Sequence, residues 1–251
     1  MSSISGGSRW HWRAWRNAAN WRALSKAVDG FHRDFGPQGG ELLLFGCSAG
    51  WMLQTAWLQS FSSIIAVDLD PLAKHLFRLR HPGLKQLAWH QGNALDTLDA
   101  LLIAHPQAAI YFDNMLGQQA LIELHELKAS DKDLALLEKS LSQLPQRLRG
   151  RFWGSLHDRV SGPVRMPSSE FKRYVHQPLS HRSPRAQPNT QLVRWLSEVE
   201  ALQAHGEWLD HLTSGVFHAD NPRVYLLWPF APQYWHWLEM AWVKPSTDTL
   251  G

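Results

Sequence analysis

The chain has 251 residues, of which 44% are hydrophobic, enough to bury the core of one α/β domain with decorations. A single cysteine, Cys47, excludes an intrachain disulfide, and no segment stays apolar for the roughly 18 residues that a membrane span needs. The formal charge of +3 is too small to indicate nucleic-acid binding by itself. Because no N-terminal segment resembles a signal peptide, we expect a soluble, cytoplasmic protein.

The N-terminal segment, residues 10–35, has a helix-forming composition without proline and is rich in tryptophan and arginine. A helical wheel predicts one apolar face, formed by Trp10, Ala14, Trp21, Leu24 and Val28. Trp12 and Trp15 point elsewhere, and the arginines are scattered around the helix. We therefore expect a capping helix that covers the sheet or a partner, although its Trp-Arg steps could also stack on bases and pair with phosphates.

Residues 41–70 carry the clearest pattern in the chain. Leu42 to Phe45 form a short apolar run between glycines, which is typical of a strand buried on both faces. The small residues Gly46-Cys47-Ser48-Ala49-Gly50 follow, and they let the backbone turn tightly and approach a ligand. A predicted helix at 51–59 then leads to a second apolar run at 64–67, which ends in Asp68. This order is that of a nucleotide-binding βαβ unit.

The alternation of helices and strands continues to residue 156. Predicted helices lie at 71–80, 97–104 and within 119–144, and predicted strands at 87–90, 108–112 and 151–156. Polar segments follow these strands at Gly92-Asn93-Ala94, Asp113-Asn114 and His157-Asp158-Arg159. Because parallel strands end at the same edge of a sheet, we expect these segments to meet where open α/β proteins bind ligands. The expected fold is a mostly parallel, doubly wound α/β sheet.

The composition changes after residue 160. Residues 161–190 contain five prolines and many basic residues, and we interpret them as a lid-like loop. A helix is predicted at 191–205 and strands at 207–212 and 223–228, while at 232–244 a helix is favoured over a strand. The single domain then consists of an N-terminal helical cap at 1–40, a core at 41–160, the lid at 161–190, and C-terminal helices and last strands at 191–251.

The order of these motifs resembles that of one family, the Rossmann-like S-adenosylmethionine-dependent methyltransferases, over roughly residues 41–156. In that family a glycine-rich loop wraps the methionine part of the cofactor, an acid ending the second strand binds the ribose, and a polar residue after the third strand reads the adenine amino group. The resemblance implies cofactor-binding roles for Gly46, Cys47, Ser48, Ala49, Gly50, Asp68, Leu69, Gly92, Asn93, Ala94 and Asn114. Asp68 would be the ribose acid, Asn93 the adenine reader, and Asn114 a neighbour of the methionine end. The family's loop follows an acid, whose place is held here by Leu44, and Ser48 stands at its middle glycine.

Candidate catalytic residues follow the fifth predicted strand. Methyl transfer from a sulfonium needs mainly in-line placement of the acceptor, and a base only where the acceptor must lose a proton. His157 and Asp158 are placed where such a base would lie, and Asp210-His211 and His218-Asp220 are further candidates. No histidine has a spacing from cysteines or carboxylates that indicates zinc ligation, so we predict no metal site.

Alternative functions remain open. The segment Gly46 to Gly50 also fits the Gly-x-Ser-x-Gly pattern of serine hydrolases, with Ser48 as nucleophile and Asp158 with His211 or His218 as partners. A non-catalytic binding protein on the same fold would use its Trp-rich ends as a contact surface. For a methyltransferase, the lid and the surplus of aromatic residues favour a small-molecule acceptor. An RNA-directed methyltransferase is a further alternative that the weak basic charge does not favour.

Overall fold

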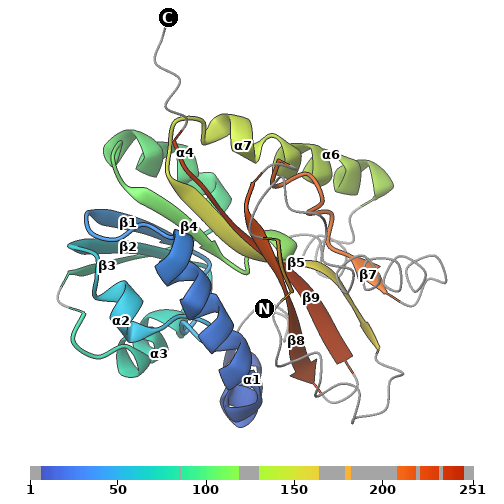
Figure 1. Ribbon diagram of the computed structural model, residues 1–251, viewed down its shortest axis with the longest axis horizontal. Helices are drawn as coiled ribbons and strands as arrows, with labels where there is room; N and C mark the ends of the chain where they lie inside the picture. The colour runs from blue at the N-terminus through green and yellow to red at the C-terminus, as the bar shows by residue number, and fades with distance from the viewer. Residues whose placement is uncertain are drawn as a thin grey trace, which may run out of the picture.

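The computed structural model describes residues 7–84, 86–118, 130–163, 179–181, 208–218, 221–231 and 234–245. In this part of the chain, nine strands form one sheet in the order β3-β2-β1-β4-β5-β9-β8-β6, with β7 paired to β5 (Figure 1). The strands are β1 Glu41–Phe45, β2 Ser63–Asp68, β3 Leu87–Gln91, β4 Ala109–Asp113, β5 Trp153–Pro163, β6 Leu179–His181, β7 Leu209–Asp210, β8 Arg223–Ala231 and β9 Tyr234–Val243. The helices are α1 Gly7–Phe35, α2 Thr55–Leu58, α3 Ala73–Arg80, α4 Ala94–Ala104, α6 Asp131–Ser142 and α7 Leu144–Arg147.

The first five strands are parallel, and this confirms the predicted doubly wound α/β fold. Strand β1 lies between β2 and β4, with Leu43 in register with Ile65 on one side and with Ile110 on the other. The chain order therefore reverses beside β1, and the carboxyl ends of β1, β2 and β4 meet at one edge of the sheet. Such a switch point is where open α/β sheets bind ligands.

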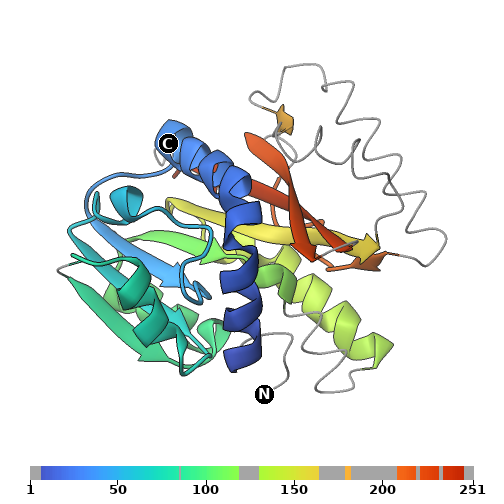
Figure 2. The ribbon, with the colours of Figure 1, turned by 90° about the horizontal axis from the view of Figure 1, so that it is seen from below.

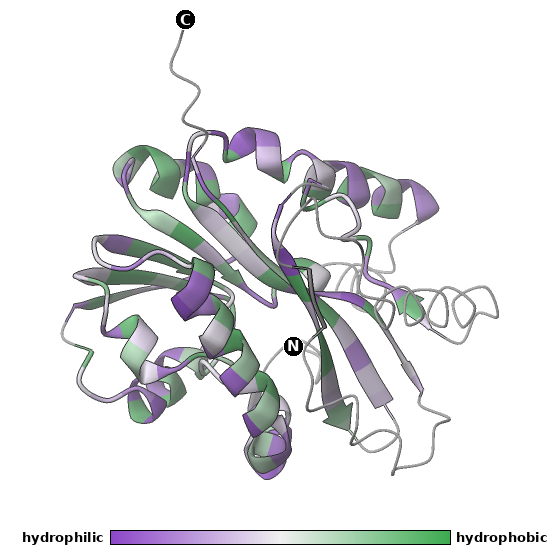
Figure 3. Cartoon of the chain, viewed as in Figure 1, coloured by the Kyte–Doolittle hydropathy of each residue, from purple (hydrophilic) through white to green (hydrophobic). Residues whose placement is uncertain are grey.

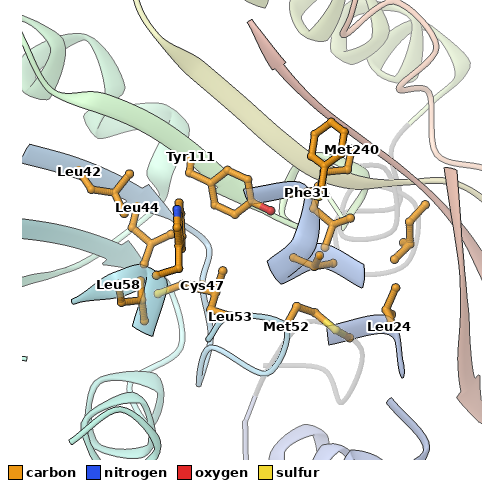
Figure 4. Close-up of a cluster of buried hydrophobic side chains, with 14 of the residues drawn as sticks. Leu24, Phe31, Leu42, Leu44, Cys47, Met52, Leu53, Leu58, Tyr111 and Met240 are labelled. Atoms are coloured by element: carbon orange, nitrogen blue, oxygen red, sulfur yellow. The ribbon is translucent and has the colours of Figure 1, made fainter. Parts of the chain in front are cut away.

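Helices cover both faces of the sheet, and successive residues of β1 therefore point into two different cores. Leu42 and Leu44 belong to one core, together with residues of α1, α2 and β9 (Figure 4). Leu43 and Phe45 belong to the other core, which α4, α6 and α7 complete. Figure 1 shows α6 and α7 on the side of the sheet opposite to α1. Within the described residues, no helix combines the length and the apolar content that a membrane crossing needs.

The predicted N-terminal helix is confirmed as α1, and its apolar face is the expected one. Ala14, Trp21, Leu24 and Val28 are buried, whereas Trp12 and Trp15 are 58% and 69% exposed. Hydrophobic residues recur along the buried side of the helix, with hydrophilic residues between them (Figure 3). The buried face packs beside β8. There Trp21 lies edge to face on Trp228, with 5.0 Å between the ring centroids. Figure 2 shows the ribbon from below, with α1 in blue crossing the sheet.

Three element predictions are wrong in type or extent. The helix expected at 51–59 is confined to Thr55–Leu58, because the preceding residues form a turn in which the Leu53 amide donates to the Gly50 carbonyl. The helix favoured at 232–244 is instead strand β9, which lies between β5 and β8 and is buried from residue 235 to residue 242. Burial on both faces removes the alternation by which a strand is recognised. Pairing with β9 also extends β5 to Pro163, so His157 and Asp158 lie within a strand and not after it.

Other boundaries differ by a few residues. Helix α3 begins at Ala73, two residues later than expected, and Asp70 accepts a hydrogen bond from the Leu72 amide at 2.9 Å in the turn before it. Helix α4 begins at Ala94, three residues earlier than expected. The helix predicted at 191–205, most of the lid and the first part of the 119–144 segment lie outside the described residues.

Candidate functional site

The loop after β1 has a backbone that its glycines make possible. Gly46, Ser48 and Gly50 have positive φ angles of 66°, 49° and 66°. A Cβ atom on Gly46 would lie 2.3 Å from Cβ of Met115, and one on Gly50 would lie 2.3 Å from Nε2 of His81. Both glycines are therefore fixed by conformation and by packing. The side chains of Cys47 and Ala49 are buried, so these two predicted residues could contact a ligand only through their backbone.

Asp68, at the end of β2, holds this loop in place. Its Oδ2 atom accepts a hydrogen bond from the Ser48 amide at 2.6 Å, and its Oδ1 atom accepts one from the Asp70 amide at 2.8 Å. The side chain is 7% exposed, and burial raises its pKa to about 6 against the pull of these two amides. Each carboxylate oxygen has one backbone donor, which fixes its direction and leaves it able to accept a second hydrogen bond.

Two further polar side chains lie at the end of β4. Asn114 was predicted, and its backbone is in the left-handed region at φ 56° while its amide donates to the Leu156 carbonyl at 2.7 Å. Asp113 was not predicted as a site residue, although it ends the strand in the same way as Asp68 ends β2. Burial and then the charge of Asp68 raise the pKa of Asp113 to about 8. Oδ1 of Asp113 and Oδ1 of Asn114 have no hydrogen-bond partner within the described residues.

The residues predicted after β3 and β2 line the rim of the same edge. Asn93 caps α4, because its side-chain oxygen accepts from the Leu95 amide at 3.1 Å. An interaction of Asn93 with adenine would therefore use its amide hydrogens or the second lone pair of that oxygen. The Gly92 amide donates to the Asp68 carbonyl at 3.0 Å, which joins the ends of β2 and β3. Ala94 is buried, whereas Leu69 is 49% exposed.

The first turns of α1 cover this edge of the sheet. Nε1 of Trp10 donates to the Ser48 hydroxyl at 3.1 Å. The Gly7 amide donates to Oδ2 of Asp70 at 2.7 Å, and Nε2 of His11 lies 2.9 Å from the same oxygen. Burial lowers the pKa of His11, so the contact to Asp70 is a hydrogen bond from a neutral imidazole at neutral pH. These contacts make α1 one wall of the candidate site.

Aromatic side chains continue this wall toward β8. Trp10 stacks on Phe230 with 5.6 Å between ring centroids, and Trp21 contacts Trp228. Nε1 of Trp21 donates to the Pro229 carbonyl at 3.0 Å. We call Trp10, Trp21, Trp228 and Phe230 the α1–β8 aromatic cluster. It contains three of the 14 tryptophans of the sequence.

The structure separates the two predicted catalytic residues, because neighbours in a strand point to opposite faces. Nδ1 of His157 lies 3.0 Å from the Ser155 hydroxyl, and its Nε2 lies 3.5 Å from Glu239. Asp158 instead receives hydrogen bonds from Nδ1 of His236 at 2.8 Å and from Gln118 at 2.5 Å. His236 was not predicted, since the segment that contains it was expected to be a helix. His157 therefore stays a sequence prediction that the arrangement of side chains does not favour.

The site and the sheet together define a class of fold. Five parallel strands in the order β3-β2-β1-β4-β5, followed by antiparallel β9 and then β8, with helices on both faces, match the Rossmann-like methyltransferase fold. The glycine loop and the two acids lie at its switch point.

Comparisons with known proteins give the following similarities. No protein-family model matches the chain, and no curated protein sequence matches it. Among solved structures it is similar to a SAM-dependent methyltransferase from Anabaena variabilis ATCC 29413, at 13% identity over 98% of this chain and 99% of that chain, with a TM-score of 0.45. N-methyltransferase NodS from Bradyrhizobium japonicum WM9, in complex with S-adenosyl-L-homocysteine, matches at 11% identity over 88% and 86% of the two chains, with a TM-score of 0.41. Phosphoethanolamine N-methyltransferase 2 from Haemonchus contortus matches at 16% identity over 88% of this chain and 53% of that longer chain, with a TM-score of 0.38.

Proposed function

We propose that the protein is an S-adenosylmethionine-dependent methyltransferase that acts on a small-molecule acceptor. The observation that supports this most is the placement of two carboxyl groups on either side of the glycine loop. Asp68 ends β2 with both oxygens aligned by backbone amides, and Asp113 ends β4 with an oxygen that has no hydrogen-bond partner among the described residues. The cofactor has two groups that match them, a ribose diol and an ammonium.

Asp68 fits the ribose diol. Its two oxygens are held in fixed directions by the Ser48 and Asp70 amides, and each can accept one more hydrogen bond. A carboxylate that accepts one bond from each of two vicinal hydroxyls gains charge-assisted hydrogen bonds without reorganisation. The loop from Gly46 to Gly50 lies beside it, as the resemblance requires.

Asp113 and Asn114 fit the ammonium of the methionine part. Both have buried oxygens that lack a partner within the described residues, and a buried acceptor of this kind is unfavourable until a donor satisfies it. An ammonium ion would supply such donors and would stabilise the ionised form of Asp113. Leu44 holds the position at which the family has an acid, and Asp113 offers a carboxyl on the neighbouring strand β4, in which Tyr111 pairs with Leu44.

A small acceptor agrees better with this site than a nucleic acid. When bound, S-adenosylmethionine supplies a methyl group on a sulfonium centre, and the chain has to orient the acceptor and exclude water. The α1–β8 aromatic cluster and the contacts of Trp10 and His11 cover the strand ends from one side. The guanidinium of Arg13 lies over Phe230 and that of Arg16 over Trp12, so both are already engaged by aromatic rings.

The serine hydrolase alternative finds no support at Ser48. Its hydroxyl accepts from Nε1 of Trp10, and no described histidine contacts it. His211, one of the two candidate bases, uses Nδ1 on the Gly117 carbonyl at 2.6 Å and Nε2 on Ser161 at 2.9 Å. A nucleophilic serine needs a base within hydrogen-bond reach.

Calorimetric titration with S-adenosylhomocysteine tests the proposed function. We expect the native protein to bind, and Asp68→Ala to lose roughly 1.5 to 3 kcal/mol of binding free energy, the range for hydrogen bonds to a charged group. Asp131→Ala, which removes an exposed carboxyl from α6, is the matched control and should bind like the native protein. Absence of binding to a well-folded native sample would contradict the proposal, and equal affinity of Asp68→Ala would remove Asp68 from the site.

A further inference from the structure

His236 and Asp158 form a buried, hydrogen-bonded pair between β9 and β5. Nδ1 of His236 lies 2.8 Å from Oδ1 of Asp158, and the two residues are 4% and 0% exposed. Burial alone would raise the pKa of Asp158, but His236, His211 and Gln118 together hold it below its usual value. A carboxylate can only accept, so His236 donates from Nδ1, and in the neutral ring Nε2 carries the lone pair. That Nε2 atom has no hydrogen-bond partner within the described residues.

The neighbouring His211 has no such free atom. Its Nδ1 donates to the Gly117 carbonyl at 2.6 Å, so its Nε2 accepts from the Ser161 hydroxyl at 2.9 Å. Asp158, His211 and His236 bring candidate metal-ligand atoms within 4.8 Å of one another. The lone pair on Nε2 is the only one that the neutral His211 ring has, and the Ser161 hydroxyl already uses it. A metal ion would therefore have to displace Ser161 from His211. The geometry therefore favours a histidine base held by Asp158 over a metal centre.

One series of contacts connects His236 to the glycine loop through aromatic rings. The His236 ring lies 4.7 Å from the Phe230 ring, and Phe230 stacks on Trp10 at 5.6 Å. Trp10 in turn donates to the hydroxyl of Ser48 in the loop at 3.1 Å. His236 is thus bordered by the α1–β8 aromatic cluster.

A second series of contacts connects Asp158 to the other end of the loop. A Cβ atom on Gly117 would lie 2.8 Å from Cβ of Asp158, so the two backbones are packed directly together. Gly117 follows Met115, whose side chain lies against Gly46, the first residue of the loop. The two series run along β8 and α1 on one side and along the segment after β4 on the other. The His236–Asp158 pair therefore closes a ring of contacts that starts and ends at the loop.

We propose that this ring encloses the acceptor site and that His236 is the general base for an acceptor with a phenolic hydroxyl. This inference rests on the proposed methyltransferase function. A neutral hydroxyl is a weak nucleophile until its proton is removed, so a base held at the acceptor site fits a hydroxyl acceptor. Aromatic neighbours fit an aromatic ring, and a phenol is acidic enough to exchange its proton with an imidazole.

The proton and the electrons balance in this step. The phenol oxygen forms a bond to the methyl carbon, the bond from that carbon to the sulfonium sulfur breaks, and the sulfur keeps the electron pair. The phenolic proton passes to Nε2 of His236, and Asp158 stabilises the imidazolium through Nδ1. Solvent takes the proton from His236 after the product leaves. His236 is the catalytic residue, and Asp158 acts through it as a positioning residue.

The probe for this site is 4-nitrophenol, whose phenolate absorbs visible light whereas the phenol does not. With saturating S-adenosylhomocysteine and at a pH where the free probe is mostly neutral, we expect the native protein to bind it with an increase in phenolate absorbance. His236→Gln should lose this increase while it binds S-adenosylhomocysteine like the native protein. His75→Gln, which changes an exposed histidine of α3, is the matched control and should behave as the native protein does.

A second measurement avoids dependence on a buried substitution. In native protein labelled with ¹⁵N-histidine, we expect one imidazole to change from the neutral to the protonated form when 4-nitrophenol saturates the complex. The inference is overturned if no imidazole changes, if phenolate absorbance is unchanged in a folded His236→Gln variant, or if metal analysis finds one tightly bound ion that His211→Ala releases. Failure to bind S-adenosylhomocysteine at all would instead contradict the proposed function, so the two failures are distinguishable.

Discussion

Replacement of Asp113 by asparagine should stabilise the protein without ligand and weaken its binding of ligand. The carboxyl is 6% exposed, and burial together with Asp68 raises its pKa to about 8 from 3.8. The folded state therefore retains a proton that the unfolded state releases above pH 4. For a raised pKa, the stability contribution is complete below the unfolded value and is lost as the pH rises toward about 8.

The size of the effect follows from the interval between the two pKa values of Asp113, 3.8 in the unfolded state and about 8 in the folded state. Each pH unit between the two pKa values costs the folded state up to ~1.4 kcal/mol, so the loss between pH 5 and pH 8 is about 4 kcal/mol. For a chain of this length, that corresponds to roughly 10 °C in melting temperature. Asparagine has no proton to lose, and Asp68 is present in both proteins. The melting temperature of Asp113→Asn minus that of the native protein should therefore increase by roughly this amount from pH 5 to pH 8.

Thermal unfolding followed by circular dichroism at pH 5, 6.5 and 8 measures this difference directly. Added S-adenosylhomocysteine should stabilise the native protein more than Asp113→Asn, because a ligand stabilises in proportion to its affinity for the folded state. Asp131→Asn, at an exposed position of α6, should show a difference that does not vary with pH. A pH-independent difference for Asp113→Asn would refute the burial argument, and equal stabilisation by the ligand would remove Asp113 from the site.

Two further predictions concern other parts of the molecule. Glu239 lies 2.5 Å from Arg223, and although burial opposes ionisation, His157, Arg159 and Arg223 hold its pKa at about 2. Glu239→Gln should lower the free energy of unfolding, measured with urea at pH 7, by about 3 to 5 kcal/mol, because it leaves a buried cation unpaired. The difference from the native protein should shrink as the pH falls from 4.5 toward 2, where Glu239 of the native protein takes up a proton. An alanine triple variant at Arg13, Arg16 and Arg22 should leave binding of short single-stranded RNA weak and nearly unchanged; tight, salt-sensitive binding that the variant loses would support an RNA-directed enzyme.

The parallel half of the sheet was predictable because its signals are local. Leu42 to Phe45 and Ile64 to Val67 are apolar on both faces, and each ends in the small or acidic residues that a switch point requires. Asp68 could be found by its position at a strand end. Asp113 occupies the equivalent position on β4, but its importance depends on its burial and on the charge of Asp68 nearby, and neither can be read from a strand pattern.

The acceptor side of the site was not predictable, because it depends on pairing across long intervals of sequence. His236 reaches Asp158 only because β9 pairs with β5, over a separation of 78 residues. Because β9 is buried on both faces from residue 235 to residue 242, its sequence gave no period by which to distinguish a strand from a helix. The same pairing lengthens β5, and this places His157 and Asp158 on opposite faces of one strand instead of together in a loop.

The contact between α1 and β8 also has a consequence for the order of events during synthesis. Trp21 donates to the carbonyl of Pro229, 208 residues further along the chain, and its ring packs on Trp228. At about 5 to 20 residues per second, the ribosome needs on the order of 10 to 40 seconds to make that interval. During this time the apolar face of the first helix has no docking surface from β8. The contacts between Trp21 and β8 therefore form only after β8 is made, and a chain that stops before β8 would leave this side of the Trp21 ring exposed to aggregation.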